Sequence, residues 1–160
     1  MGWVPENKLL KVKAKRMNDG KWIKGYCFKE QECTYLITGR QYEDIIHSFT
    51  HVTEECYDMF SIKAYKIDPG TICLCTGKEY MNGETAYEGD IFESQAGGQL
   101  MILRFGTYQA YCPADRTYMD SVGFYAECEG YPDMPIGDLK DYALKAGNIF
   151  DNTDLVSIQK

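Results

Sequence analysis

The sequence predicts a mainly β fold in which short antiparallel strands build a barrel-like core, either SH3-like or a small sandwich, with one or two short helices. Short runs of alternating apolar and polar residues recur along most of the chain, and turns containing Gly, Asn or Pro separate them at near-regular intervals. Tyrosine is over-represented, at 13 residues, and aromatic side chains favour half-buried pleated surfaces. Both observations favour β structure throughout the chain.

The first strands are predicted to form a hairpin. Apolar residues alternate with lysines over residues 10–15, which is the period of a half-buried strand. Residues 18–20, Asn-Asp-Gly, are typical of a tight hairpin turn. The strand that returns over residues 21–28 would place Trp22, Lys24 and Tyr26 on one face.

Residues 40–49 are predicted to form a helix, because apolar residues recur there at steps of three and four. A turn is predicted at Asp68-Pro69-Gly70. A boundary at this turn would give an N-terminal unit, residues 1–67, and a C-terminal barrel-like unit, residues 68–160, which we expect to share one compact fold. Further strands are predicted at 33–38, 60–67, 71–76, 87–93, 99–105, 108–112 and 122–128, and one or two helical turns at 138–144.

The net charge of −7 argues against general nucleic-acid binding, which depends on neutralising phosphates. However, residues 8–24 hold seven Lys and Arg against one acid. The favoured interpretation is the solvated face of an edge hairpin, where lysines also prevent unwanted strand pairing. The alternative is a nucleic-acid-binding face on which Trp22 and Tyr26 stack against bases. This candidate face consists of Lys13, Lys15, Lys21, Trp22, Lys24 and Tyr26.

The chain is expected to act in the cytoplasm without a membrane partner. Its longest apolar run, residues 100–103, is far shorter than the ~20 residues that a membrane span needs. Residues 1–6 lack the pattern of a secretory signal. The seven cysteines are odd in number and irregular in spacing, so we expect reduced thiols in structural positions.

His47 and His51 are four residues apart and would share one face of a helix, a spacing that suits zinc. The residues between them do not complete the zinc-protease motif, and the chain has no other histidine. Cys73 and Cys75 alone would supply half of a metal site. We therefore predict no metal, no cofactor and no catalytic residue. A metal-dependent enzyme built on the two histidines is the least favoured alternative.

One segment has a specific order of residues: Thr76-Gly77, then Asn82-Gly83-Glu84, then Tyr87-Glu88-Gly89-Asp90-Ile91. This order resembles the central motif of the YopX-like family of bacteriophage and prophage proteins. Residues 15–26, 68–71 and 146–152 are similar to other stretches of that family. The sequence departs from the family at Cys73-Leu74-Cys75 and at Ala86.

The resemblance implies a β fold with a barrel-like core, encoded by a phage or prophage and found in a bacterial host cell. It implies no catalytic residue. The distinctive residues are ordinary turn formers, so a structural role is favoured over a binding role. They are Thr76, Gly77, Asn82, Gly83, Tyr87, Glu88, Gly89, Asp90, Gly147 and Asn148.

The predicted function is that of a non-enzymatic phage accessory protein that binds a protein partner or associates with itself. The sequence lacks any catalytic signature, and aromatic-rich β surfaces with unpaired strand edges suit such binding. The alternatives are the nucleic-acid-binding β-barrel and, behind it, the metal-dependent enzyme.

Overall fold

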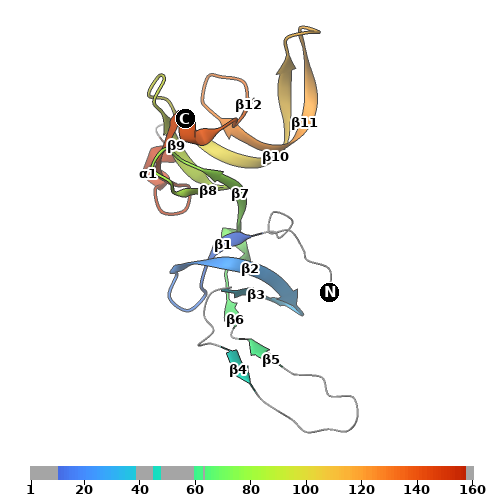
Figure 1. Ribbon diagram of the computed structural model, residues 1–160, viewed down its shortest axis with the longest axis vertical. Coiled ribbons are helices and arrows are strands. Elements are labelled where there is room, and N and C mark those ends of the chain that lie inside the picture. Colours follow the sequence, from blue (N-terminus) through green and yellow to red (C-terminus); the bar gives the residue numbers. More distant parts are fainter. Residues whose placement is uncertain (1–10, 39–44, 48–59, 63, 158–160) are drawn as a thin grey trace. The chain divides into compact units, whose positions relative to one another are not determined.

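A computed structural model describes residues 11–38, 45–47, 60–62 and 64–157 (Figure 1). These residues form antiparallel sheets with few short helices, which confirms the predicted mainly β, barrel-like fold class. The contacts divide the chain into two compact units between Ile72 and Cys73.

The N-terminal unit contains an antiparallel sheet with the strand order β6-β3-β2-β1. β2 is the longest of its strands, and its first half pairs with β1 while its second half pairs with β3. A separate hairpin of β4 and β5 also belongs to this unit. The strands are β1 (Val12–Lys15), β2 (Trp22–Glu30), β3 (Cys33–Ile37), β4 (Ile45–His47), β5 (Phe60–Ile62) and β6 (Ala64–Lys66).

Gly25 marks the place where β2 changes its pairing partner. A Cβ atom at this position would lie 2.0 Å from the carbonyl oxygen of Ile37, so the two backbones can approach only because residue 25 is glycine. Val12, opposite Gly25, and Leu36 lie on the same face and are buried. This face is the inner face of the sheet, and the alternate residues of each strand therefore lie on the outer face.

The two predicted turns of this unit are present. The Asp19 carboxylate accepts a hydrogen bond from the Lys21 N–H at 3.1 Å and pairs with the Arg16 guanidinium. The Asp68 carboxylate accepts from the Gly70 N–H at 2.9 Å and begins the 3-10 turn η3 (Pro69–Thr71). Both turns are thus closed by an aspartate side chain two residues ahead of the donor.

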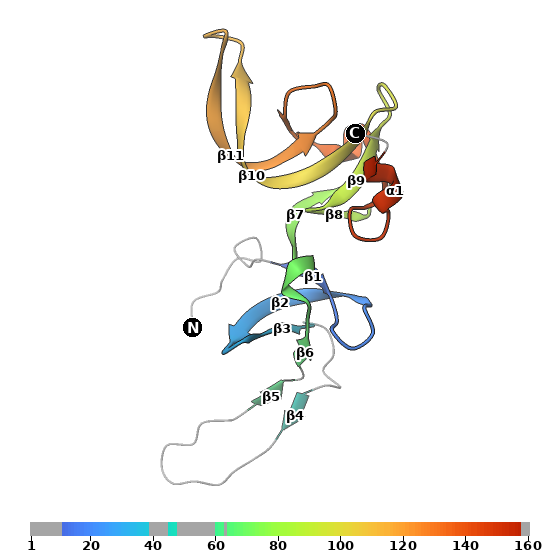
Figure 2. The ribbon, with the colours of Figure 1, turned by 180° about the vertical axis from the view of Figure 1, so that it is seen from behind.

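The C-terminal unit holds a five-stranded sheet with the order β12-β11-β10-β9-β13, which curves into a half-barrel, and a pair formed by β7 and β8 (Figure 1, Figure 2). Two 3-10 or α-helical turns complete it. The elements are β7 (Cys73–Glu79), β8 (Thr85–Tyr87), β9 (Asp90–Ser94), β10 (Leu100–Cys112), β11 (Thr117–Glu127), β12 (Met134–Pro135), η4 (Leu139–Asp141), β13 (Ala143–Asn148) and α1 (Thr153–Ser157).

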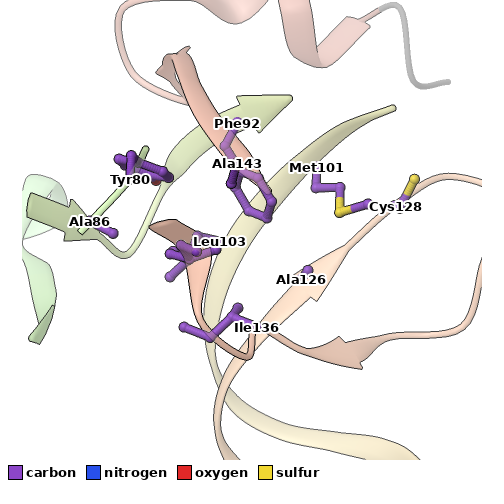
Figure 3. Close-up of a cluster of buried hydrophobic side chains, with 10 residues drawn as sticks. Tyr80, Ala86, Phe92, Met101, Leu103, Ala126, Cys128, Ile136 and Ala143 are labelled. Carbon is purple, nitrogen blue, oxygen red and sulfur yellow. The ribbon is translucent and has the colours of Figure 1, made fainter. Parts of the chain in front are cut away.

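The core of this unit lies where β9, the first part of β10 and β13 meet (Figure 3). Phe92 is fully buried at its centre and contacts the rings of Tyr80 and Tyr142, with centroids 6.1 and 6.4 Å away. Leu103 and Leu139 are also fully buried in this cluster. These side chains anchor the first few residues of β10, whereas the rest of that strand extends beyond the core.

Three predicted elements are corrected by the structure. Within the predicted helix 40–49, residues 45–47 form strand β4, because they pair with β5; the other residues of that segment lie outside the described part. Strands predicted separately at 99–105 and 108–112 are one strand, β10, since Gly106 bends it without ending it. The helical turns predicted at 138–144 are confirmed over Leu139–Asp141, which form η4, but Ala143 and Leu144 instead begin β13, which pairs with β9.

Candidate functional site

The most exposed part of the C-terminal unit is a two-stranded ribbon formed by β10 and β11. β9 pairs with β10 only over residues 100–102, and β12 pairs with β11 only over residues 125–126. Within the described part of the chain, residues 106–112 and 117–123 therefore pair only with each other. We call residues 104–127 the ribbon. Figure 1 and Figure 2 show it curving away from the other strands of the half-barrel.

The ribbon bends at a pair of glycines. Gly106 lies opposite Gly123, and their φ angles are 149° and 158°. These angles are rare for residues that carry a Cβ atom. On the same face, the rings of Tyr108 and Tyr125 stack across this gap with centroids 4.9 Å apart. The bare backbone of the bend is thus covered by two aromatic rings.

The opposite face of the ribbon carries a row of cross-strand pairs with exposed apolar side chains. Phe105 lies opposite Phe124, with ring centroids 4.9 Å apart, and Phe105 is 44% exposed. Val122 is 76% exposed. At the far end, the exposed rings of Tyr111 and Tyr118 lie 5.3 Å apart. We call this surface the ribbon face; it comprises Phe105, Thr107, Gln109, Tyr111, Tyr118, Asp120, Val122 and Phe124.

The sequence reasoning missed the ribbon face. Its alternation is visible in residues 104–112, but alternation alone does not tell which face is covered. Aromatic residues on a strand usually indicate a core, and their exposure here follows because residues 105–123 extend beyond the buried cluster of this unit.

The predicted basic face lies on the outer face of the N-terminal sheet. The register places Lys15 opposite Trp22 and Lys13 opposite Lys24. Tyr26 follows on the same face of β2, whereas Lys21 precedes the strand and its backbone closes the turn. Five of the six predicted residues are thus brought to one face.

The structure adds three residues to this surface. Phe28 continues the face along β2, lies opposite Tyr35 of β3, and is 40% exposed. The two rings stack with centroids 5.5 Å apart and an interplanar angle of 22°. Lys66 of β6 lies opposite Tyr35 and is exposed. The alternation of faces along β2 would have predicted Phe28 on this surface. The positions of Tyr35 and Lys66 depend on the pairing of β3 and β6, which the sequence does not reveal. We call Lys13, Lys15, Trp22, Lys24, Tyr26, Phe28, Tyr35 and Lys66 the Lys–aromatic face.

Two ammonium groups lie against one indole ring. The Nζ atoms of Lys13 and Lys15 are 5.1 and 5.2 Å from the centre of the Trp22 ring, within the range of cation–π attraction. Lys13 is only 4% exposed. Its side chain therefore supports Trp22, and the more accessible charges of this face are those of Lys24 and Lys66.

The residues of the central motif make local structural contacts. The Thr76 hydroxyl donates to the Ala86 carbonyl at 2.9 Å, and the Asn82 side chain accepts from the Glu84 N–H at 3.1 Å. The Glu88 carboxylate accepts from the Leu74 N–H at 3.4 Å. Gly77, Gly83 and Gly89 all have positive φ; Gly83 and Gly89 lie in turns, and Gly77 lies within β7 where its register with β8 shifts.

The closing motif packs directly on the central one. Asn148 pairs with Asp90 in the sheet register, and the Gly89 carbonyl accepts from the Ile149 N–H at 2.9 Å. The Asn148 side chain accepts from two backbone N–H groups in its own turn, both within 3.0 Å. A Cβ atom on Gly147 would lie 2.4 Å from the Asn152 side-chain oxygen. The two motifs together form one structural junction.

Asp90 is the buried charge of this junction. It has no exposed surface, and its carboxylate accepts from the Tyr87 N–H at 2.9 Å and from the Tyr80 hydroxyl at 3.2 Å. The Lys145 ammonium lies 3.6 Å away. Burial, with the Asp90 charge, raises the pKa of Tyr80 above its usual range. Burial, with the Cys75 thiol nearby, raises the pKa of Tyr87 to about 12. Both hydroxyls stay protonated at neutral pH, so the group is suited to holding structure rather than moving protons.

Among the described residues, no group of three or more His, Cys, Asp or Glu side chains is placed to hold a metal ion. His51 lies outside the described part of the chain, and only the backbone of His47 is described. Cys73 is buried and Cys75 is half-buried, both in β7.

In comparisons with known proteins, no family model, no curated protein and no solved structure matches this chain. None of the helices in the described residues has the length and apolar character needed to cross a membrane.

Proposed function

We propose that this chain is a non-enzymatic protein that acts by self-association, and that the ribbon face is its contact surface. The exposed apolar side chains of the ribbon face, which are Phe105, Tyr111, Tyr118 and Val122, carry this proposal. A two-stranded ribbon is marginally stable in water, and its apolar side chains gain free energy when another surface covers them. Aromatic side chains are also the residues most enriched at the centres of protein interfaces.

The charge of the ribbon favours a second copy as the partner. Residues 73–160 contain six Lys and Arg against fourteen Asp and Glu, and such units repel one another. The ribbon, residues 104–127, is closer to neutral, with two Arg against two Asp and one Glu. Contact through this weakly charged segment brings two copies together without opposing their acidic surfaces.

The free edge of β10 adds a second reason. Residues 106–112, Gly-Thr-Tyr-Gln-Ala-Tyr-Cys, carry no charge and no proline. Natural edges are usually protected by one or the other. An uncharged edge can pair antiparallel with its own copy in several registers without placing like charges opposite each other.

The resemblance to the YopX-like family adds a setting to this proposal: a phage or prophage accessory protein that works in the cytoplasm of a bacterial host. An assembly of copies would present several Lys–aromatic faces at once. The self-association proposal itself depends on the ribbon and not on the family.

Sedimentation velocity over a concentration series tests the proposal. We expect the wild-type protein to form a dimer, and Val122→Lys or Tyr111→Lys to weaken it by at least about 30-fold, the effect of losing one interface hot spot. Met81→Lys and Tyr131→Lys change apolar residues of the same unit outside the ribbon, with exposures close to that of Tyr111, and should leave the dimer intact. A wild-type protein that stays monomeric at all concentrations, or equal loss in the control variants, contradicts the proposal.

A further inference from the structure

We propose that the Lys–aromatic face binds single-stranded nucleic acid, with bases stacked on Phe28 and Tyr35 and phosphates near Lys24 and Lys66. This surface belongs to the N-terminal unit and is separate from the ribbon. The inference therefore goes beyond self-association and does not depend on it.

The net charge of the whole chain differs from the net charge of the N-terminal unit. Residues 1–72 contain eleven Lys and Arg against ten Asp and Glu, so the acidic excess of the protein lies in residues 73–160. On the outer face of the described sheet, four lysines stand against one acid, Glu30, at the end of β2. The objection from net charge thus applies to the C-terminal unit and not to this face.

The aromatic side chains provide the surface for bases. Phe28 and Tyr35 are stacked together, and Phe28 leaves much of its ring exposed, so an unstacked base can extend the stack. Trp22 and Phe28 are six residues apart on β2, a span of roughly 20 Å at the usual rise of a strand. Tyr26 lies between them on the same face. The face therefore offers aromatic contacts along a line rather than at a single point.

The lysines provide the contacts to the backbone of the strand. Lys24 lies between Trp22 and Tyr26 on β2, and Lys66 lies beside Tyr35 at the β6 edge. A pocket lined by Met17, Asn18, Ala64, Tyr65 and Lys66 adjoins this edge. Charges interleaved with aromatic rings suit a flexible strand whose bases and phosphates both turn toward the protein. A duplex keeps its bases stacked inside and could use only the charges.

Fluorescence anisotropy with labelled oligothymidylate and oligouridylate tests the inference on the full-length protein. We expect binding at low salt and a slope of log K against log salt of about −1.4, because two phosphate contacts, to Lys24 and Lys66, each contribute about −0.7 on a single strand. A duplex of the same length should compete poorly. No binding at low salt, or equal competition by the duplex, overturns the inference.

Matched variants identify the face. Lys24→Gln should reduce the salt slope by about 0.7, whereas Lys29→Gln, an exposed lysine on the inner-face side of the same strand, should not. Phe28→Ala should weaken binding by about 5- to 150-fold, the range for losing one stacked base. Tyr131→Ala, an exposed aromatic residue of the C-terminal unit outside the ribbon, should leave oligonucleotide affinity unchanged. Equal losses for Lys29→Gln and Lys24→Gln would overturn the assignment of the face.

The same variants separate this inference from the proposed function. Phe28→Ala and Lys24→Gln should self-associate like the wild type, and Val122→Lys should bind oligonucleotide like the wild type once both are measured at concentrations where they are monomeric. Loss of oligonucleotide binding in Val122→Lys under those conditions would show that the Lys–aromatic face is not the binding surface.

Discussion

Gly106 and Gly123 face each other across the ribbon, and both have φ angles that other residues rarely adopt. The bend therefore requires a glycine on each strand at the same position of the register. A Cβ atom at either position would meet no heavy atom within 4 Å, so the requirement is conformational and not steric.

Replacing either glycine by alanine should strain the bend. We expect Gly106→Ala and Gly123→Ala each to lower the free energy of unfolding by about 1 to 3 kcal/mol, the usual cost of holding a residue in such a conformation. Urea denaturation measures this. Ser121→Ala on the same strand is the control and should change stability by less than about 0.5 kcal/mol. Equal effects at all three positions would argue against a special backbone at the glycines.

Asp90→Asn should destabilise the C-terminal unit, because it removes the charge that faces Lys145 inside the junction of the two motifs. We expect a loss of about 2 to 4 kcal/mol, somewhat below the range for a fully buried ion pair because Lys145 is partly exposed. Asp138→Asn breaks a comparable pair with Lys140 on the surface and should cost less than about 1 kcal/mol. Similar values for the two variants would contradict a structural role for Asp90.

Stability should fall in alkaline solution because of Tyr87. Its pKa is raised from about 10 to about 12 in the folded protein, so the folded state holds a proton that the unfolded state releases first. The contribution of the neutral hydroxyl is fully present below about pH 10 and is lost as the pH rises through 12. Tyr87→Phe should make the loss of stability between these values smaller without removing it, because the pKa of Tyr80 is also raised, whereas Tyr111→Phe, at an exposed tyrosine, should leave the loss unchanged. Denaturant unfolding at a series of pH values measures the slope.

Asn148→Ala should weaken the closing turn. The Asn148 side chain accepts from the Phe150 and Asp151 N–H groups at 2.9 and 3.0 Å, and both donors lose their partner in the variant. We expect a loss of about 1 to 3 kcal/mol. Asp151→Ala removes the exposed bond from the Asn148 amide but leaves the Asn148 side-chain oxygen in place to accept from the backbone, and it should cost less. Thermal unfolding of the two variants gives the comparison, and the reverse order would contradict this account of the turn.

Local signals predicted the parts of the fold whose geometry is set by neighbouring residues. The Asn-Asp-Gly and Asp-Pro-Gly segments form turns because aspartate closes them onto nearby N–H groups. The alternation in β2 places Trp22 and Lys24 on one face, as predicted. Such features can be predicted because they depend only on a few residues that are adjacent in the sequence.

Features that depend on distant pairing could not be predicted. Residues 45–47 form a strand because β5 lies beside them, although their spacing is that of a helix. From the sequence alone, Gly106 predicts the end of a strand. Its pairing with Gly123 shows that the strand continues through it. The hydrogen bond between Gly89 and Ile149 and the pairing of Phe28 with Tyr35 likewise follow from sheet registers, which local sequence patterns do not predict.

Within the ribbon, Ala126 belongs to the buried cluster and Phe124 packs against it, whereas no residue from 105 to 123 does either. Substitutions in this stretch, apart from the two glycines, can therefore accumulate without costing the fold much of its stability. The contact surface can therefore accumulate amino-acid substitutions faster than the scaffold can. Related chains should keep the core and the glycine pair while their ribbons diverge, which would let one scaffold acquire new binding specificities quickly.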